Sequence, residues 1–217
     1  MENKIVIPTG YMGSGSSAVT DFLSEVDGYS CTNGNFEYVF MHCPNGVFDL
    51  EDKLLKGNNA FRSDEALHAF YSCMKTLYTN KYYWVADYKD KVGPDFMSWC
   101  EEFISSLMDE RTKDVYWYYQ ENPNEKIYIE KAMAKIIKLI TFGKVVPKPG
   151  LRYEEMWLSY TTPSEFYSRA RILLDKFFLQ MGISNSNIIL DQFVLPHNLY
   201  RIENYFEDNC KVIVVDR

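Results

Sequence analysis

The sequence lacks the features that mark nucleic-acid binders and membrane proteins. Of its 217 residues, 23 are Lys or Arg and 30 are Asp or Glu, which gives a net charge of −7. A general nucleic-acid binder needs a positively charged surface that releases counterions from phosphates, so this charge argues against that function. No stretch approaches the roughly 18 apolar residues of a membrane span, and the apolar stretch after Lys4 is too short for a signal peptide. We therefore expect a cytoplasmic protein without a membrane span.

The five cysteines form no pattern typical of a metal or redox site. No two of them have the spacing of a C-x-x-C pair or a zinc cluster, and their odd number does not suit a disulfide framework. We expect reduced, buried thiols and no metal. Aromatic residues, in contrast, make up 16% of the chain, which excludes intrinsic disorder and indicates a globular protein.

Apolar spacing predicts alternating strands and helices. Short β-branched or aromatic runs predict strands at Lys4–Thr9, Phe36–Met41, Tyr82–Ala86, Asn187–Leu190 and Lys211–Val215. Helical periodicity predicts helices at Ser16–Val26, after Ser63, after Gly93-Pro94, at Glu125–Ile140, and from Thr162 to Gly182, with a loop at Val145–Gly150. The last helix begins with a capping-box pattern, and Pro163 occupies its first position. The continuously apolar run at Lys211–Val215 predicts a strand covered on both faces, as in a parallel sheet.

A glycine-rich loop, Thr9–Val19 (TGYMGSGSSAV), follows the first expected strand and opens the first expected helix. Its glycines, Gly10, Gly13 and Gly15, allow successive backbone N–H groups to point inward. The positive end of the following helix adds to such a cradle, which suits a phosphate or sulfate. The alternative is a glycine-rich turn without a ligand.

One residue of this loop distinguishes between the classes of enzyme that have such a loop. Gly10 and Gly15 have the Walker A spacing, and the loop resembles that of shikimate kinase and related small-molecule kinases, but Ser16 occupies the position of the motif's lysine. A kinase needs that lysine to hold the β- and γ-phosphates. The serine therefore argues against an active kinase.

Segments at the two ends of the sequence resemble the P-loop sulfotransferases. Gly13-Ser14-Gly15-Ser16-Ser17 is similar to their K/R-S-G-T-T/S loop, and Lys211–Arg217 resembles their second signature, a strand ending in arginine that continues as R-D-P-R-D. The resemblance implies a P-loop NTPase-like three-layer α/β domain with a central parallel sheet and a helical insertion at about residues 94–182. It also implies that the family continues beyond this arginine, so we expect a single domain that is incomplete at its C-terminus.

The resemblance further implies a co-substrate, 3′-phosphoadenosine 5′-phosphosulfate, and a hydroxyl-bearing acceptor. A saccharide is the candidate acceptor. The implied donor-binding residues are Gly10, Gly13, Ser14, Gly15, Ser16, Ser17 and Arg217, of which Arg217 binds the 3′-phosphate. Aromatic groups at Tyr82–Trp84, Tyr116–Tyr119 and Tyr153–Tyr160 are candidates for stacking on a sugar ring, although such residues are more often ordinary half-buried aromatics.

Sulfuryl transfer also needs positive charge and a base. Gly13 stands where the family has its loop lysine or arginine, so Lys91, with Lys89 beside it, is the expected substitute; a solvated loop lysine is the alternative. Glu37 is the first candidate for the base, because the glycosaminoglycan sulfotransferases have a glutamate followed by aromatic residues after the first helix. It is otherwise a surface carboxylate.

His197 is the second candidate for the base, because it follows Pro196 at the expected start of a helix after a strand. A capping or structural histidine is the alternative. Two other functions remain open for the whole chain: a relative of small-molecule or nucleoside kinases, and a nucleotide- or anion-binding module without catalysis.

Overall fold

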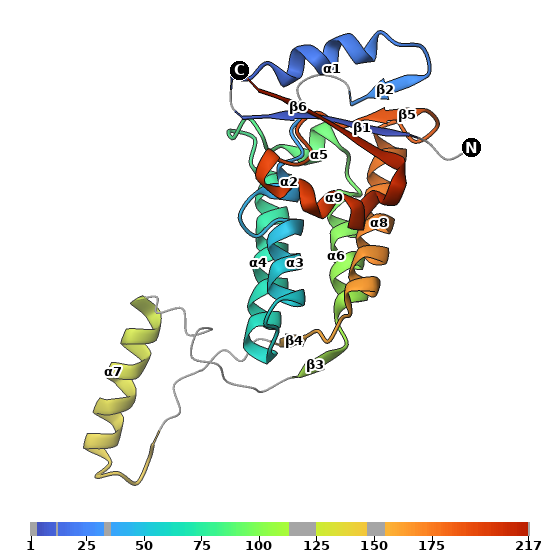
Figure 1. Ribbon diagram of the computed structural model, residues 1–217. Helices are drawn as coiled ribbons and strands as arrows, with labels where there is room; N and C mark the ends of the chain where they lie inside the picture. The colour runs from blue at the N-terminus through green and yellow to red at the C-terminus, as the bar shows by residue number, and fades with distance from the viewer. Residues whose placement is uncertain (1–3, 12, 33–35, 113–124, 147–154, 217) are drawn as a thin grey trace. The chain divides into compact units, whose positions relative to one another are not determined.

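The structure, a computed structural model, describes residues 4–11, 13–32, 36–112, 125–146 and 155–216 (Figure 1). The chain divides into two compact units. One comprises Met1–Asp109 and Ser159–Arg217, and the other comprises Glu110–Leu158.

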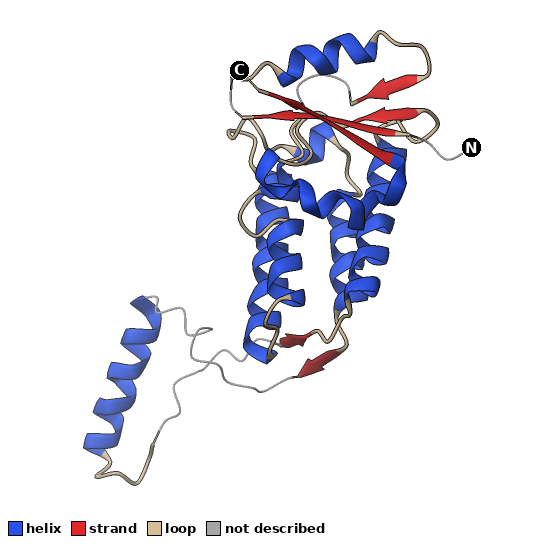
Figure 2. Ribbon diagram, viewed as in Figure 1, coloured by secondary structure: helices blue, strands red, loops and turns tan. Residues whose placement is uncertain are grey.

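The first unit contains a parallel sheet of four strands in the order β2-β5-β1-β6 (Figure 2). These strands are β1 (Ile5–Gly10), β2 (Tyr29–Cys31), β5 (Asn187–Ile189) and β6 (Cys210–Val215). In the register of β1, Val6 lies opposite Ile189 of β5 on one side and Lys211 of β6 on the other. The α/β class and the parallel sheet expected from the sequence are therefore confirmed.

Two of the expected strands are wrong. Within Phe36–Met41 the backbone forms the short helix α2 (Val39–His42), and Tyr82–Ala86 forms turns that lead to helix α5 (Tyr88–Lys91). Aromatic runs favour strands only because strands often offer half-buried positions for large side chains. Here Tyr38 and Phe40 are buried instead in a cluster of aromatic rings that includes Phe177 of helix α8.

The expected burial of the last strand is also wrong. β6 lies at an edge of the described sheet, and its Ile213 and Val214 side chains are exposed. A run of apolar residues identifies a strand, but it does not reveal how many neighbours that strand has.

Helix α1 (Ser16–Ser24) covers one face of the sheet, whereas α2, α8 (Pro163–Gln180) and α9 (Ile202–Phe206) lie on the other side (Figure 1). The helix after the loop is confirmed, but its expected apolar stripe is not the buried face. Phe22 and Val26 are exposed, and the buried residues of α1 are Ser16 and Thr20. These small side chains allow α1 to lie close to the sheet.

Four helices form the body of the first unit below the sheet (Figure 1). Each helix packs against the next in the order α3 (Val47–Leu55), α4 (Ala60–Thr79), α6 (Phe96–Leu107) and α8. The capping box of α8 is confirmed: Thr162 and Glu165 exchange hydrogen bonds, and Gly182 follows the helix with a φ of +73°. Helix α4 begins earlier than Ser63, because Asn59 caps it by accepting a hydrogen bond from the backbone N–H of Arg62.

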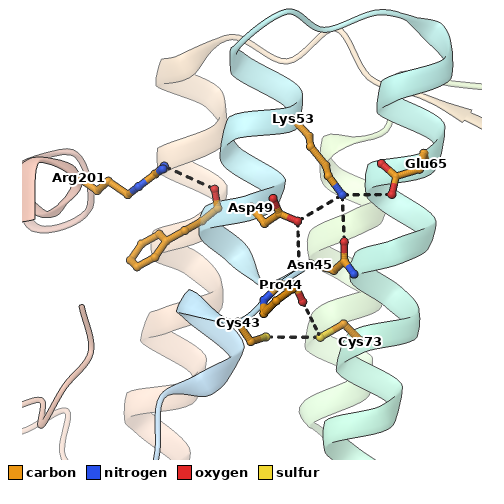
Figure 3. A network of polar contacts seen from close by, with 9 residues as sticks. Cys43, Pro44, Asn45, Asp49, Lys53, Glu65, Cys73 and Arg201 are labelled. Carbon is orange, nitrogen blue, oxygen red and sulfur yellow. Dashed lines mark hydrogen bonds and ion pairs between the residues drawn. The ribbon is translucent and has the colours of Figure 1, made fainter. Parts of the chain in front are cut away.

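Polar contacts join these helices to each other (Figure 3). Lys53 of α3 contacts Asp49 on its own helix at 3.3 Å and Glu65 on α4 at 3.1 Å, and it donates to Asn45. Beside this cluster, the sulfur atoms of Cys43 and Cys73 lie 3.5 Å apart.

A second polar cluster is buried where α3, α8 and the 3-10 helix η2 (Pro196–Arg201) meet. Arg201 contacts Glu51 at 3.0 Å and Asp52 at 2.5 Å. The carboxylate of Glu51 also accepts hydrogen bonds from Tyr167 and Tyr205, each at 2.9 Å. Both oxygens of Glu51 therefore have partners, as a buried charge requires.

The second unit contains an antiparallel pair of strands, β3 (Glu110–Thr112) and β4 (Met156–Leu158), and helix α7 (Glu125–Ile140). Helix α7 confirms the helix expected at these residues. The expected loop at Val145–Gly150 is described only at its first two residues, and Tyr116–Tyr119 lie outside the described residues. Among the described residues, no helix is both long and apolar enough to cross a membrane.

Candidate anion-binding site

The glycine-rich loop connects the carboxyl end of β1 to the start of α1. Gly13 and Gly15 have φ angles of +82° and +92°, in the left-handed region where glycine is favoured. Gly15 is the N-terminal cap of α1, and its carbonyl accepts a hydrogen bond from Ala18 N–H at 3.1 Å. Glycine is therefore required at these two positions by the turn from strand to helix.

Gly10 is constrained by close contacts instead of by its backbone angles. A Cβ atom at this position would lie 2.1 Å from Ser14 Oγ and 2.7 Å from the carbonyl oxygen of Val215. The loop thus folds back on the end of β1 and packs against the end of β6, so any larger residue at position 10 must displace it.

The three loop serines have different surroundings. Ser14 Oγ is buried and has no hydrogen-bond partner among the described residues. Ser16 is buried, and its Oγ accepts a hydrogen bond of 3.0 Å from Gln192 Nε2. Ser17 is exposed, and its Oγ donates to Asp191 Oδ2 at 3.2 Å. Since a buried hydroxyl normally has a partner, Ser14 is the loop serine whose hydrogen-bonding capacity is unused among the described residues.

Asp191 and Gln192 are site residues that the sequence reasoning missed. They follow β5, whose neighbour in the sheet is β1, so the two strands bring them beside the loop. The available signal was a polar residue directly after the apolar stretch Asn187–Leu190, because side chains at the carboxyl ends of parallel strands often form sites.

The loop lies where the chain leaves two neighbouring strands in opposite directions. After β1 the chain continues into α1 on one face of the sheet, and after β5 it continues toward α9 on the other face (Figure 1). In open α/β sheets, ligands bind in the crevice outside the carboxyl ends of strands at such a point.

Glu37, Asp191 and Lys91 share one electrostatic environment. Burial raises the pKa of Glu37, the charge of Asp191 raises it further, and the charge of Lys91 lowers it. Burial also raises the pKa of Asp191, against the effect of hydrogen bonds from Thr20 and Ser17. The structure thus brings the expected base and the expected cation together, although they are distant in sequence.

Helix α5 positions both residues of this pair. Tyr88, at its start, is buried and donates a hydrogen bond of 2.8 Å to the backbone carbonyl of Glu37. Lys91, at its end, is exposed, and its Nζ donates to the carbonyl of Trp84 at 2.6 Å. Lys91 is therefore the last residue of a short helix, and the turn before that helix lies where the sequence predicted the strand Tyr82–Ala86.

His197 lies at the second residue of η2 and is exposed. Its neighbour is His42, whose pKa is lowered by burial and then by the charge of His197. The charge of His197 thus acts on another histidine, whereas Glu37 interacts electrostatically with Lys91 and Asp191. Arg217, the expected ligand of the donor 3′-phosphate, lies outside the described residues.

Within the described part of the chain, no group of three or more His, Cys, Asp or Glu side chains is arranged to hold a metal ion. Comparisons of the sequence with family models, and of the chain with curated proteins and solved structures, give no significant match.

Proposed function

We propose that the protein is a sulfotransferase-like enzyme that binds 3′-phosphoadenosine 5′-phosphosulfate at the loop from Gly10 to Ser17. The observation that carries this proposal is Ser16. At the position where a kinase has its phosphate-binding lysine, this chain has a buried serine whose hydroxyl is already bound to Gln192. Such a loop offers backbone N–H groups and hydroxyls to an anion without that lysine, as in the sulfotransferase loops that it resembles.

The donor cradle fits an anion in two respects. Ser14 Oγ is buried and unpartnered in the described structure, so it has a hydrogen bond to offer. Lys91, whose charge lowers the pKa of Glu37, brings positive charge into the environment that Glu37 shares with Asp191 beside the loop. Both features favour binding of a phosphosulfate over an empty loop.

Sulfate transfer breaks the bond between sulfur and the leaving phosphate oxygen and forms a bond between sulfur and the acceptor oxygen. In this proposal the acceptor hydroxyl loses its proton to Glu37, whose raised pKa suits a general base. Lys91 contributes positive charge at the same site. The loop N–H groups stabilise the charge that develops on the leaving phosphate.

The acceptor that the surroundings favour is a saccharide. Tyr82 and Trp84 lie in the turn that precedes α5, and their side chains are 102% and 70% exposed. The hydrogen bond from Lys91 to the Trp84 carbonyl ties this turn to the site. Exposed aromatic rings beside a base provide a surface on which a sugar ring can stack.

A second function is favoured by one contact, the hydrogen bond between Ser17 and Asp191. In P-loop NTPases, a loop Ser or Thr and a separate Asp hold the Mg²⁺ ion of the nucleotide. Ser17 occupies that position of the loop, and Asp191 follows the strand next to β1. This alternative is a nucleotide-binding relative of the kinases, without the catalytic lysine.

Calorimetric titration separates the two functions. We expect 3′-phosphoadenosine 5′-phosphate to bind without Mg²⁺, and ATP to bind at least tenfold more weakly. Binding of ATP that requires Mg²⁺, with no binding of the bisphosphate, would contradict the sulfotransferase proposal and support the alternative.

The role of Glu37 is tested by transfer of radioactive sulfate from the donor to a panel of oligosaccharides. We expect Glu37→Gln to lower kcat by about a hundredfold or more, because loss of a general base commonly has this effect. Bisphosphate affinity should stay within about threefold of the unaltered protein, since the base contacts the acceptor. Equal kcat values for the two proteins would exclude Glu37 as the base.

A further inference from the structure

Helix α7 has one strongly apolar side. With about 3.6 residues per turn, six large side chains fall on less than half of its circumference. They are Tyr128, Ile129, Met133, Ile136, Leu139 and Ile140, each at least 50% exposed. Phe142, Val145 and Val146, directly after the helix, are also exposed. An apolar patch of this extent is unusual on a free protein surface and indicates a binding surface.

The opposite side of the same helix is basic. Lys131, Lys135 and Lys138 lie there, with Glu130 as the one acidic residue on that side of the described helix. Residues 125–146 contain five lysines and two glutamates, a net charge of +3, which leaves −10 on the rest of the chain. Positive charge is thus concentrated in the segment that exposes the apolar residues.

We propose that residues 125–146 bind the surface of an anionic lipid membrane. The apolar side of α7 would enter the boundary between headgroups and acyl chains, and its lysines would contact the acidic headgroups. A helix with aliphatic and aromatic residues on one side and lysines on the other is typical of helices that lie in this interface. This inference does not depend on the proposed enzymatic function.

The charge of the segment favours a lipid surface over a second copy of the chain. Two copies joined through α7 would bring segments of equal positive charge together, whereas an anionic membrane attracts each of them. Lysines near a membrane surface strengthen binding when that surface carries anionic lipid.

Co-sedimentation of the full chain with vesicles tests the inference. We expect binding to phosphatidylcholine vesicles that contain phosphatidylglycerol, and at least tenfold weaker binding to pure phosphatidylcholine vesicles. The double variant Lys135→Gln/Lys138→Gln should weaken binding to the anionic vesicles about thirtyfold. The double variant Leu139→Ser/Ile140→Ser should weaken it more than tenfold, because it removes apolar area from the buried side.

The matched control is Ile172→Ser/Leu179→Ser, which removes two exposed aliphatic side chains from α8. Its vesicle binding should equal that of the unaltered protein, and circular dichroism should show that each variant keeps its helices. Absence of binding to anionic vesicles would overturn the inference, as would equal binding to neutral vesicles. Self-association without lipid that Leu139→Ser/Ile140→Ser abolishes would overturn it in favour of a second copy.

Discussion

Two regions of the first unit contain buried polar groups, and they differ in how those groups are satisfied. In the helical body, both oxygens of Glu51 accept hydrogen bonds from tyrosines, and Arg201 neutralises its charge. At the carboxyl edge of the sheet, Ser14 Oγ and Asp191 Oδ1 are buried without a partner among the described residues.

Under the proposed function, this difference separates a region that serves stability from a region that serves binding. A buried polar atom without a partner costs about 1–3 kcal/mol, and a ligand that supplies the missing partner recovers that cost. The Glu51 carboxylate has no such requirement, because Tyr167, Tyr205 and Arg201 contact its two oxygens, although Arg201 Nε in the same cluster has no hydrogen-bond partner among the described residues. Variants in the two regions should therefore affect different quantities, stability in one and affinity in the other.

The largest effect is expected from Glu51→Ala. The variant leaves the buried Arg201 with Asp52 as its remaining acidic partner and removes the acceptor of Tyr167 and Tyr205, and breaking a buried ion pair in this way costs about 3–5 kcal/mol. The free energy of unfolding from urea titrations should fall by this amount, while affinity for 3′-phosphoadenosine 5′-phosphate should be unchanged where the variant is folded. The double variant Glu51→Ala/Arg201→Met removes both charges, so it should be more stable than the single variant. A double variant of equal or lower stability would show that the charge of Arg201 is not the cause.

Gly10→Ala should produce the opposite pattern. The added Cβ would meet Ser14 Oγ and the Val215 carbonyl, so the loop must move and affinity for the bisphosphate should fall by a hundredfold or more. The control is Gly28→Ala, at a positive φ of 85° with no atom near the added Cβ, which should cost about 1 kcal/mol of stability and no affinity. An unchanged affinity in Gly10→Ala would remove the loop from the site.

Local signals in the sequence predicted several helices and strands correctly. The capping box of α8, the helix at Glu125–Ile140 and the strand before the glycine loop depend on neighbouring residues, and each is confirmed. The segments at Phe36–Met41 and Tyr82–Ala86 failed because aromatic residues pack equally well outside a sheet.

The remaining features depend on contacts between distant parts of the chain. Asp191 reaches Ser17 only because β5 lies beside β1, and this strand order cannot be read from either segment alone. The partners of Glu51 come from α8, α9 and η2, which follow it by more than a hundred residues. The pairing of Glu37 with Lys91 likewise depends on Tyr88, a buried residue that the sequence reasoning did not single out.

Asp191→Asn should have a smaller effect, and its direction separates the two candidate functions. Removing a negative charge beside the cradle should increase affinity for the bisphosphate about tenfold, since nearby charges at a partly exposed site interact with a few kcal/mol at most. If Asp191 instead holds Mg²⁺, the variant should weaken Mg²⁺-dependent ATP binding. The control is Asp175→Asn, because burial also raises the pKa of Asp175, which lies on α8. Calorimetry of the three proteins should show the gain for Asp191→Asn only.

The smallest effect is the pH dependence of stability. Its sign distinguishes a carboxyl whose ionised form is disfavoured in the folded protein from one whose ionised form is favoured there. The pKa of Asp191 in the folded protein lies above its ordinary value of 3.8. As pH rises above 3.8, Asp191 loses its proton in the unfolded chain before it does so in the folded protein. The folded state therefore loses stability until Asp191 is ionised in the folded protein too. Asp191→Asn should therefore be more stable than the unaltered protein above this range, by less than about 1 kcal/mol because the group is partly exposed to water.

Glu165 provides the opposite case, since its capping hydrogen bonds lower its pKa below 4.5, and the stability it contributes should be lost as pH falls. Urea titrations of Asp191→Asn and Glu165→Gln between pH 3 and pH 7 should thus give differences of opposite sign from the unaltered protein. Differences of the same sign would mean that Asp191 is stabilised where it lies, and the contrast between the satisfied Glu51 carboxylate and the unsatisfied edge of the sheet would then fail at Asp191.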